Sequence, residues 1–155
     1  MKIILSACLC GINCKYDGGN NLNDKAVELL KSGKALPVCP EQLGGQATPR
    51  IPHEIIDSTG EEVLDGKGVI KGPEGDDVTD EFLKGAQETL KIAQAVGAEY
   101  AVLKARSPSC GFGMIYDGSF TGDKKEGNGV TAALLNRNGI KIYTEENIEE
   151  LLDLI

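Results

Sequence analysis

Three of the five cysteines, Cys8, Cys39 and Cys110, each follow a short apolar segment with the character of a buried β-strand. The carboxyl ends of parallel strands share one edge of a sheet, and ligands of α/β proteins bind at that edge. Residues separated by 31 and 71 positions can therefore meet at one point. Three converging thiolates predict a metal or iron–sulfur site, because soft sulfur ligands suit zinc and iron–sulfur clusters alike.

Core packing is the alternative interpretation of these cysteines, because a free cysteine is often a small buried residue. All three lie just after their strands, in segments that contain Gly and Pro, and this position favours ligation. Cys39 is followed by Pro40, as in the Cys-Pro that ends common iron–sulfur motifs. No compact Cys-x-x-Cys pair is present, so the residues alone leave zinc, a cluster and plain packing open.

A fourth thiolate would decide whether such a site is closed. Three protein ligands leave one position for a substrate, whereas four close the site. Cys14 is the candidate fourth ligand, because it precedes a polar turn, Lys15–Gly19, near the same edge; otherwise it is a nearby free thiol. Cys10 is interpreted as packing. The one histidine, His53, is expected in a surface loop, which weakens both a histidine-containing zinc site and a Cys–His hydrolase.

Glu41 and two serines are the polar candidates beside the cysteines. Glu41 is two residues past Cys39, where it could serve as a general acid or base, with a solvated loop carboxylate as the alternative. Ser107 and Ser109 flank Pro108, which holds the backbone and hence the hydroxyls, although a simple turn explains them too. Asp17 is a second acidic candidate. Arg50 and Arg106 are expected to have surface roles, and Gly127–Gly129 is expected to cap a helix.

Composition limits the class of protein. The 155 residues predict a single domain, 1–155, and with 41% apolar and 26% charged residues they predict a soluble globular protein. No apolar run is long enough to span a membrane, and the first residues lack a signal-peptide pattern, so a cytoplasmic location with reduced thiols is expected. A net charge of −8 and only 5% aromatic residues argue against nucleic acid, so the expected partner is a small molecule, and oligomeric state stays open.

Strand and helix patterns alternate along the chain. Buried strands are predicted over 2–7, 35–39, 99–104 and 140–143. Helices are predicted over 24–32 with Asn23 as N-cap, from Thr79 as N-cap to Gly97, from Asn128 or Gly129 to Asn138, and after Thr144 as N-cap. Hairpins are predicted around Asp65-Gly66 and Asp117-Gly118. The order predicts an α/β fold, a small doubly wound, Rossmann-like parallel sheet of strand order 2-1-3-4, with a hairpin-containing insertion after the second strand. Cys8 and Cys110 would then flank the switch-point crevice, with Cys39 one strand away.

Six segments in this order resemble the thiouracil desulfurase-like family over essentially the whole chain. They are Ser6-Ala7-Cys8, Cys14-Lys15-Tyr16-Asp17-Gly18, Pro37-Val38-Cys39-Pro40-Glu41, Thr48-Pro49-Arg50, Ser107-Pro108-Ser109-Cys110-Gly111 and Gly127-Asn128-Gly129-Val130-Thr131-Ala132. Cys10 departs from the pattern, because the family usually has an aliphatic residue there.

The resemblance implies a [4Fe-4S] cluster held by Cys8, Cys39 and Cys110, with one iron open. It implies non-redox removal of sulfur from a small thiolated pyrimidine such as 2-thiouracil, with Glu41 and a serine of Ser107-Pro108-Ser109 facing the substrate. Two alternatives stay open at this point. One is a non-catalytic module in which Cys14 completes a closed four-cysteine zinc or iron–sulfur site, for redox sensing or structure; the other is desulfuration of a thiolated nucleoside or RNA.

Overall fold

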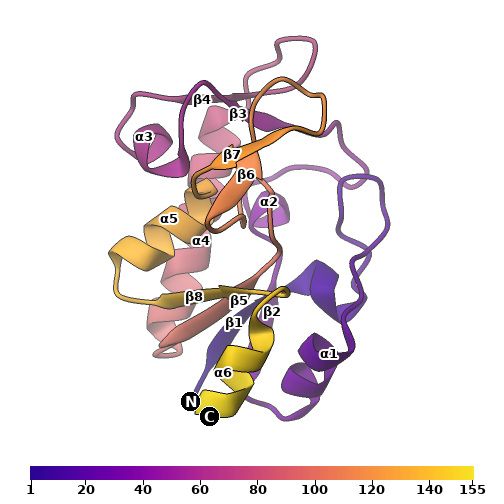
Figure 1. Ribbon diagram of the computed structural model, residues 1–155, viewed down its shortest axis with the longest axis vertical. Coiled ribbons are helices and arrows are strands. Elements are labelled where there is room, and N and C mark those ends of the chain that lie inside the picture. Colours follow the sequence, from indigo (N-terminus) through magenta and orange to yellow (C-terminus); the bar gives the residue numbers. More distant parts are fainter.

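A parallel sheet of four strands forms the centre of the computed structural model, which describes residues 1–155 (Figure 1). The strands lie in the order β2 (Ala35–Val38), β1 (Ile3–Ser6), β5 (Tyr100–Leu103) and β8 (Lys141–Thr144). This order confirms both the predicted 2-1-3-4 arrangement of the main strands and the Rossmann-like class. The direction of winding reverses between β1 and β5, which places the switch-point crevice at their carboxyl ends.

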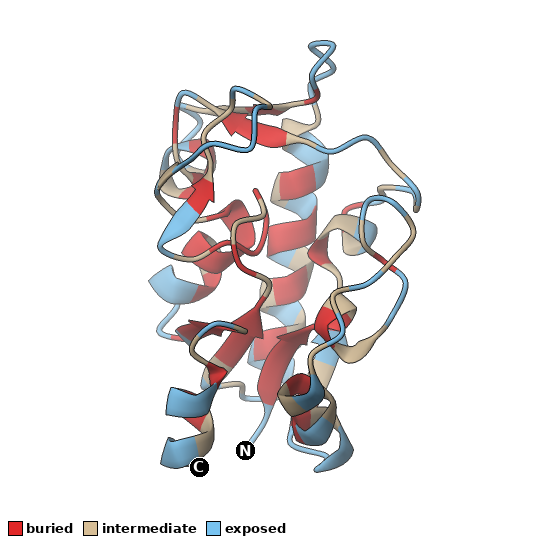
Figure 2. Cartoon of the chain, turned by 45° about the vertical axis from the view of Figure 1, so that its right-hand side comes forward, coloured by how far each residue is buried: buried red, intermediate tan, exposed pale blue.

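Helices cover both faces of this sheet (Figures 1 and 2). They are α1 (Asp24–Lys31) and α6 (Ile148–Leu154) on one face, and α4 (Thr79–Ala95) and α5 (Val130–Arg137) on the other. Because successive strand residues point to opposite faces, Ile3 and Leu5 pack with α1 and α6, whereas Ile4 packs with α4 and α5. Burial on both faces explains why β1 is a continuous apolar run rather than an alternating one.

The predicted helix cap at Asn23 is correct, whereas those at Thr79 and Thr144 are wrong. The side chain of Asn23 accepts a backbone N–H in the first turn of α1 at 3.1 Å, as predicted. Thr79 is not a cap, because it is the first residue of α4 and its hydroxyl donates to Asp77 at 2.6 Å. Thr144 is not one either, because Asn147 occupies the cap position of α6 and accepts the Thr144 backbone N–H at 2.8 Å.

The insertion after β2 contains more structure than a hairpin. It consists of α2 (Pro40–Leu43), β3 (Glu54–Ile56), α3 (Gly60–Leu64) and β4 (Val69–Lys71). The predicted hairpin about Asp65-Gly66 is wrong, since the residues before this turn form α3 and β4 pairs antiparallel with β3 instead. The reason is tertiary, because the helix allows Val63 to pack with Ile55 and Ile70 in a small core that also contains Phe82 and Ala86 of α4.

The second hairpin is real but has a longer turn than predicted. It joins β6 (Met114–Tyr116) to β7 (Lys124–Glu126), so Ser119 and Phe120 belong to the turn and not to a strand. Both small sheets lie beyond the carboxyl edge of the main sheet, so they cover its switch point (Figure 1). None of the helices has the length and apolar character required to cross a membrane.

Candidate metal centre

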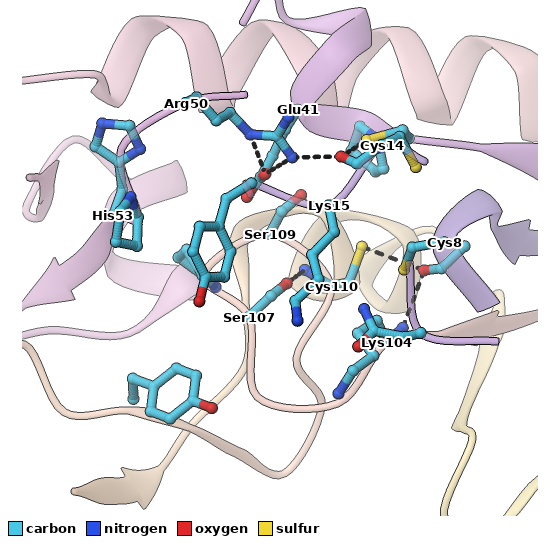
Figure 3. Close-up of a pocket in the computed structure, with 18 of the residues that line it drawn as sticks. Cys8, Cys14, Lys15, Glu41, Arg50, His53, Lys104, Ser107, Ser109 and Cys110 are labelled. Carbon is cyan, nitrogen blue, oxygen red and sulfur yellow. Dashed lines mark hydrogen bonds and ion pairs between the residues drawn. The ribbon is translucent and has the colours of Figure 1, made fainter. Parts of the chain in front are cut away.

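A cavity of about 590 Å³ lies at the carboxyl edge of the main sheet. Its wall is built by the segments that follow β1, β2 and β5, by the chain leading into β3, and by part of the β6–β7 hairpin. Four of the five cysteines line it, namely Cys8, Cys14, Cys39 and Cys110, and Figure 3 shows how labelled side chains from these segments surround the same space.

The three cysteines expected to converge are brought together in this cavity. Cys8 lies in η1, a single 3-10 turn (Ala7–Cys10) that begins directly after β1. Cys39 occupies the N-cap position of α2, one residue past β2. Cys110 lies in the loop after β5, only 6% exposed, and its sulfur accepts a hydrogen bond from the hydroxyl of Ser6 at 3.4 Å. Topology alone therefore explains why residues so far apart in sequence share one site.

Burial and mutual proximity control the protonation of these thiols. Burial raises the pKa of Cys8, and it raises the pKa of Cys110 to about 12. The neighbouring Cys39 charge raises both values further. A bound cation would oppose these effects, because metal ligation requires the thiolate. Burial thus disfavours three thiolate charges in this cavity, and a bound positive centre would stabilise them.

Cys14 is paired with Cys39. It is 2% exposed, and its carbonyl oxygen lies 3.8 Å from the sulfur of Cys39. The nearby Cys14 thiol lowers the pKa of Cys39, and the Cys39 sulfur in turn raises the pKa of Cys14. The backbone N–H of Gln42 also lowers the pKa of Cys39. The two thiols therefore titrate as a pair in which Cys39 is the more acidic member.

Glu41 is held by Arg50, which the sequence placed wrongly on the surface. The Arg50 side chain is only 7% exposed, and its Nε and Nη2 both reach Oε2 of Glu41, at 2.8 and 2.5 Å. Nη2 also donates to the carbonyl of Cys14 at 2.8 Å, so the guanidinium joins α2 to the Cys14 loop. No protein donor reaches Oε1 of Glu41, which leaves this oxygen available to a ligand. Glu41 and Arg50 are nine residues apart, a spacing that no helix or strand period relates. In the sequence, only the Thr48-Pro49-Arg50 segment indicated that Arg50 belongs to the site.

The two serines differ in what their hydroxyls already do. Ser107 Oγ accepts the backbone N–H of Cys110 at 2.7 Å, so its own hydrogen remains free to donate. Ser109 is 2% exposed and shares a hydrogen bond of 2.8 Å with the hydroxyl of Thr131 at the start of α5. Both line the cavity, and the hydrogen of the Ser107 hydroxyl is available to a ligand, whereas the Ser109 hydroxyl is already paired with Thr131.

The remaining candidates fall into structural positions. His53 is not a surface residue, because its ring is 6% exposed, lines the cavity and contacts Asp76 at 3.1 Å. Asp17 lies outside the cavity wall, and the backbone N–H of Gly19 lowers its pKa. Cys10 lies outside the wall too, packed against the core beneath α1 and α6.

Two further expectations are confirmed. Arg106, 35% exposed, pairs with Glu146 at the surface, as expected. Gly129 is the N-cap of α5, as the capping interpretation predicted.

Three contacts that the sequence did not indicate fix the loop before Cys110. Glu145, just past β8, accepts the backbone N–H of Ala105 at 2.7 Å and pairs with Lys104 Nζ at 2.8 Å. The backbone N–H of Lys104 donates to the hydroxyl of Ser6 at 2.9 Å. These contacts tie the loop to the ends of β1 and β8, and none of them has a local sequence signal.

The donor set suits a cluster better than a single ion. The three convergent donors are all sulfur, which is the ligand type of iron–sulfur clusters. No group of three or more His, Cys, Asp or Glu side chains lies close enough together to hold one metal ion. A cluster of several irons is wider than one ion, so thiolates that line a cavity without touching a common point match it.

Comparison with known proteins supports the same interpretation. The family model described as 2-thiouracil desulfurase matches residues 3–147. The chain belongs to the 2-thiouracil desulfurase family. A curated relative, the uncharacterized protein YbbK of Bacillus subtilis (strain 168), is 45% identical over 150 residues, which cover 97% of this chain and 99% of YbbK. A solved structure, the [4Fe-4S]-dependent thiouracil desulfidase TudS, superposes with a TM-score of 0.86 at 41% identity and covers 99% of both chains. The likeness to TudS extends over nearly the whole chain, so it includes both small sheets over the cavity.

Proposed function

We propose that this protein removes sulfur from a thiolated pyrimidine such as 2-thiouracil, without net redox change, by means of a [4Fe-4S] cluster held by Cys8, Cys39 and Cys110. The observation that carries the proposal is the meeting of these three thiols, from three strand ends, in one cavity. The family membership and the likeness to the [4Fe-4S]-dependent TudS support the same activity.

The residues present fit the proposed cofactor. Three protein thiolates leave one of four irons without a protein ligand, and such an iron supplies a Lewis-acidic site for sulfur when the cluster is bound. Metal ligation requires thiolates, and the neighbouring Cys14 thiol and the Gln42 N–H lower the pKa of one proposed ligand, Cys39. We assign Cys14 as a neighbour of this ligand and not as a member of the ligand set, which leaves the cofactor with three protein thiolates.

Glu41 and Ser107 supply the polar chemistry of the protein. The reaction exchanges C=S for C=O, so water provides the oxygen, sulfide leaves, and no electrons are gained or lost. Oε1 of Glu41, free of protein partners while Arg50 holds Oε2, accepts a proton from the attacking water. The free hydrogen of Ser107 Oγ donates to the ring and fixes its orientation, and Ser109 keeps that loop in place through Thr131.

A thiolated nucleoside is the second candidate substrate. The cavity of about 590 Å³ would hold the cluster as well as the substrate, so its volume alone does not choose between a free base and a nucleoside. Nucleic acid is a weaker candidate, because the chain carries a net charge of −8 and the two lysines that line the cavity, Lys15 and Lys104, are paired with Asp17 and Glu145. We further propose a cytoplasmic location, which agrees with five cysteines that are all free thiols. We also propose that the chain acts as a single domain.

Anaerobic purification followed by assay tests the proposal. The expected protein is brown, contains iron and acid-labile sulfide in equal amounts, and converts 2-thiouracil to uracil with release of one sulfide per turnover. Parallel assays with 2-thiouridine and 4-thiouridine rank the two substrate classes. A colourless zinc protein, or an iron–sulfur protein that releases no sulfide from any of these compounds, would overturn the proposal.

A further inference from the structure

We propose that Ser6 is a positioning residue for the cluster, because its hydroxyl donates a fixed hydrogen bond to the sulfur of Cys110 and draws electron density from that ligand. This inference rests on the proposed function, since it requires Cys110 to be a ligand. The inference adds Ser6 to the residues of the proposed site. Ser6 is the last residue of β1, whereas Cys110 lies in the loop that follows β5.

The direction of the hydrogen bond follows from the partners of Ser6. The backbone N–H of Lys104 lies 2.9 Å from Ser6 Oγ, and an amide N–H can only donate. The hydroxyl oxygen is therefore an acceptor toward Lys104. Its single hydrogen remains for the other partner, which is Cys110 Sγ at 3.4 Å. The bond consequently runs from oxygen to sulfur, and both ends are buried, with Ser6 2% exposed and Cys110 6% exposed.

The fold holds this geometry without help from solvent. Ser6 is the last residue of β1 and pairs in register with Val38, the last residue of β2, so it cannot slide along the sheet. It points to the same face of β1 as Ile4, two residues earlier, and Ile4 shares its apolar core with Cys110. An apolar residue would be the usual occupant of such a position, since a buried hydroxyl is favourable only when its hydrogen bonds are made.

The chemical consequence concerns the electrons of the bound cluster. Hydrogen bonds to the sulfur ligands are one of the means by which proteins set iron–sulfur reduction potentials. A donor to a thiolate stabilises the more negative, reduced cluster, so it raises the potential. The same bond withdraws charge from the sulfur and leaves the iron atoms more electrophilic. It also fixes the orientation of the Cys110 side chain.

A purely structural role for Ser6 would give a different result. If the hydroxyl served only to satisfy the Lys104 N–H, its loss would lower the stability of the fold but leave the electronic properties of the cluster unchanged. The test therefore measures the reduction potential of the holoprotein besides its stability and activity.

Three anaerobically purified holoproteins make the comparison, which are the wild type, Ser6→Ala and a matched control, Ser58→Ala. Ser58 is also buried, and its hydroxyl donates to the carbonyl of Ile56 at 2.9 Å, on β3. Spectroelectrochemistry should show a shift to more negative potential in Ser6→Ala and none in Ser58→Ala. Equal potentials in all three proteins would overturn the inference.

A second measurement does not depend on the folding of a variant. Wild-type holoprotein produced in H₂O and in D₂O should differ in its Fe–S(Cys) stretching bands in the resonance Raman spectrum, because an O–H···S bond couples to these modes. Unshifted bands overturn the inference, whether or not Ser6→Ala folds.

Cys110→Ala separates the two levels of the argument. Full iron and sulfide content in Cys110→Ala would show that the proposed ligand set is wrong, and the role of Ser6 would fall with it. Loss of the cluster in Cys110→Ala together with an unchanged potential in Ser6→Ala would overturn only the role of Ser6.

Discussion

Gly85 of α4 packs directly against the carbonyl group of Pro40, the residue that separates Cys39 from Glu41. A Cβ at position 85 would overlap this carbonyl oxygen, and a Cβ at Gly44 of the α2 C-cap would overlap the carbonyl of Glu81 on α4. The two helices thus meet backbone to backbone. A remote helix therefore sets the position of a proposed ligand and of the proposed general base.

Gly85→Ala is expected to lower both stability and activity. Alanine favours an isolated helix by about 1 kcal/mol over glycine, but here the added methyl group must push two backbones apart. Overpacking of this kind costs about 1–3 kcal/mol, so the melting temperature should fall. The displaced Glu41 should lower kcat by about tenfold or more, since misplacement by about 1 Å has large effects on catalysis.

Gln87→Ala, at an exposed position of the same helix, is the matched control and should leave both properties unchanged. A Gly85→Ala protein that melts and turns over like the wild type would contradict the importance of this contact.

Serine substitutions should divide the five cysteines into two groups. Cys8→Ser, Cys39→Ser and Cys110→Ser are expected to lose most iron, acid-labile sulfide and visible absorption, because hydroxyl oxygen is a poor ligand for iron–sulfur clusters. Cys10→Ser, outside the cavity wall, serves as the control and should retain all three.

Cys14→Ser is the informative member of this series. If Cys14 is only a neighbour of Cys39, the variant should retain the iron, because serine keeps a hydrogen-bonding group at this position. Loss of iron equal to that in Cys39→Ser would instead identify Cys14 as a fourth ligand and return the closed-site interpretation.

Glu41→Gln should lower kcat by about 10²–10⁴-fold, the range typical of loss of a general base. Glutamine keeps the shape of the side chain but cannot take a proton, so the iron content should be unchanged. Arg50→Lys should give a smaller decrease in kcat with little change in KM, because lysine keeps the charge but not the paired contacts to Oε2.

Steady-state kinetics on protein matched for iron content provides the measurement. The assignment of Glu41 as the base does not survive if Glu41→Gln retains wild-type kcat at equal iron content.

Asp77→Ala should weaken the start of α4 in a pH-dependent manner. Hydrogen bonds from the hydroxyl and the backbone N–H of Thr79 lower the pKa of Asp77. A lowered carboxyl pKa stabilises the fold above the unfolded pKa, about 3.9, and this contribution is lost as the pH falls through the folded value. Water screens the site, so the difference in free energy of unfolding at pH 7 should be about 0.5–1 kcal/mol.

Urea unfolding at pH 7 and at pH 3 checks this expectation, with Glu74→Ala in the same exposed segment as the control. The difference between wild type and Asp77→Ala should shrink at the lower pH. A difference that grows on acidification would have the wrong sign for a stabilising carboxylate.

The sequence by itself determined the main sheet and the meeting of the cysteines. Residues 3–6, 35–38, 100–103 and 141–144 carry enough apolar character to be recognised as buried strands, and Asn23 and the glycines mark helix ends by local chemistry. Right-handed crossovers leave few ways to order four such strands. Once the order is known, Cys8, Cys39 and Cys110 must lie at one edge, because each follows the end of a parallel strand.

Only the tertiary structure decided how that edge becomes a site. Three-residue strands such as β3 and β6 have little intrinsic preference, so their positions depend on packing of Ile55 and Ile115 in one apolar cluster with residues of α4. The ion pair of Arg50 with Glu41 and the hydrogen bond from Ser6 to Cys110 join residues whose spacing in the sequence follows no helix or strand period. Such contacts depend on where the fold buries each polar atom. A buried polar atom must form a hydrogen bond, and its partner is whichever polar group the tertiary structure places next to it.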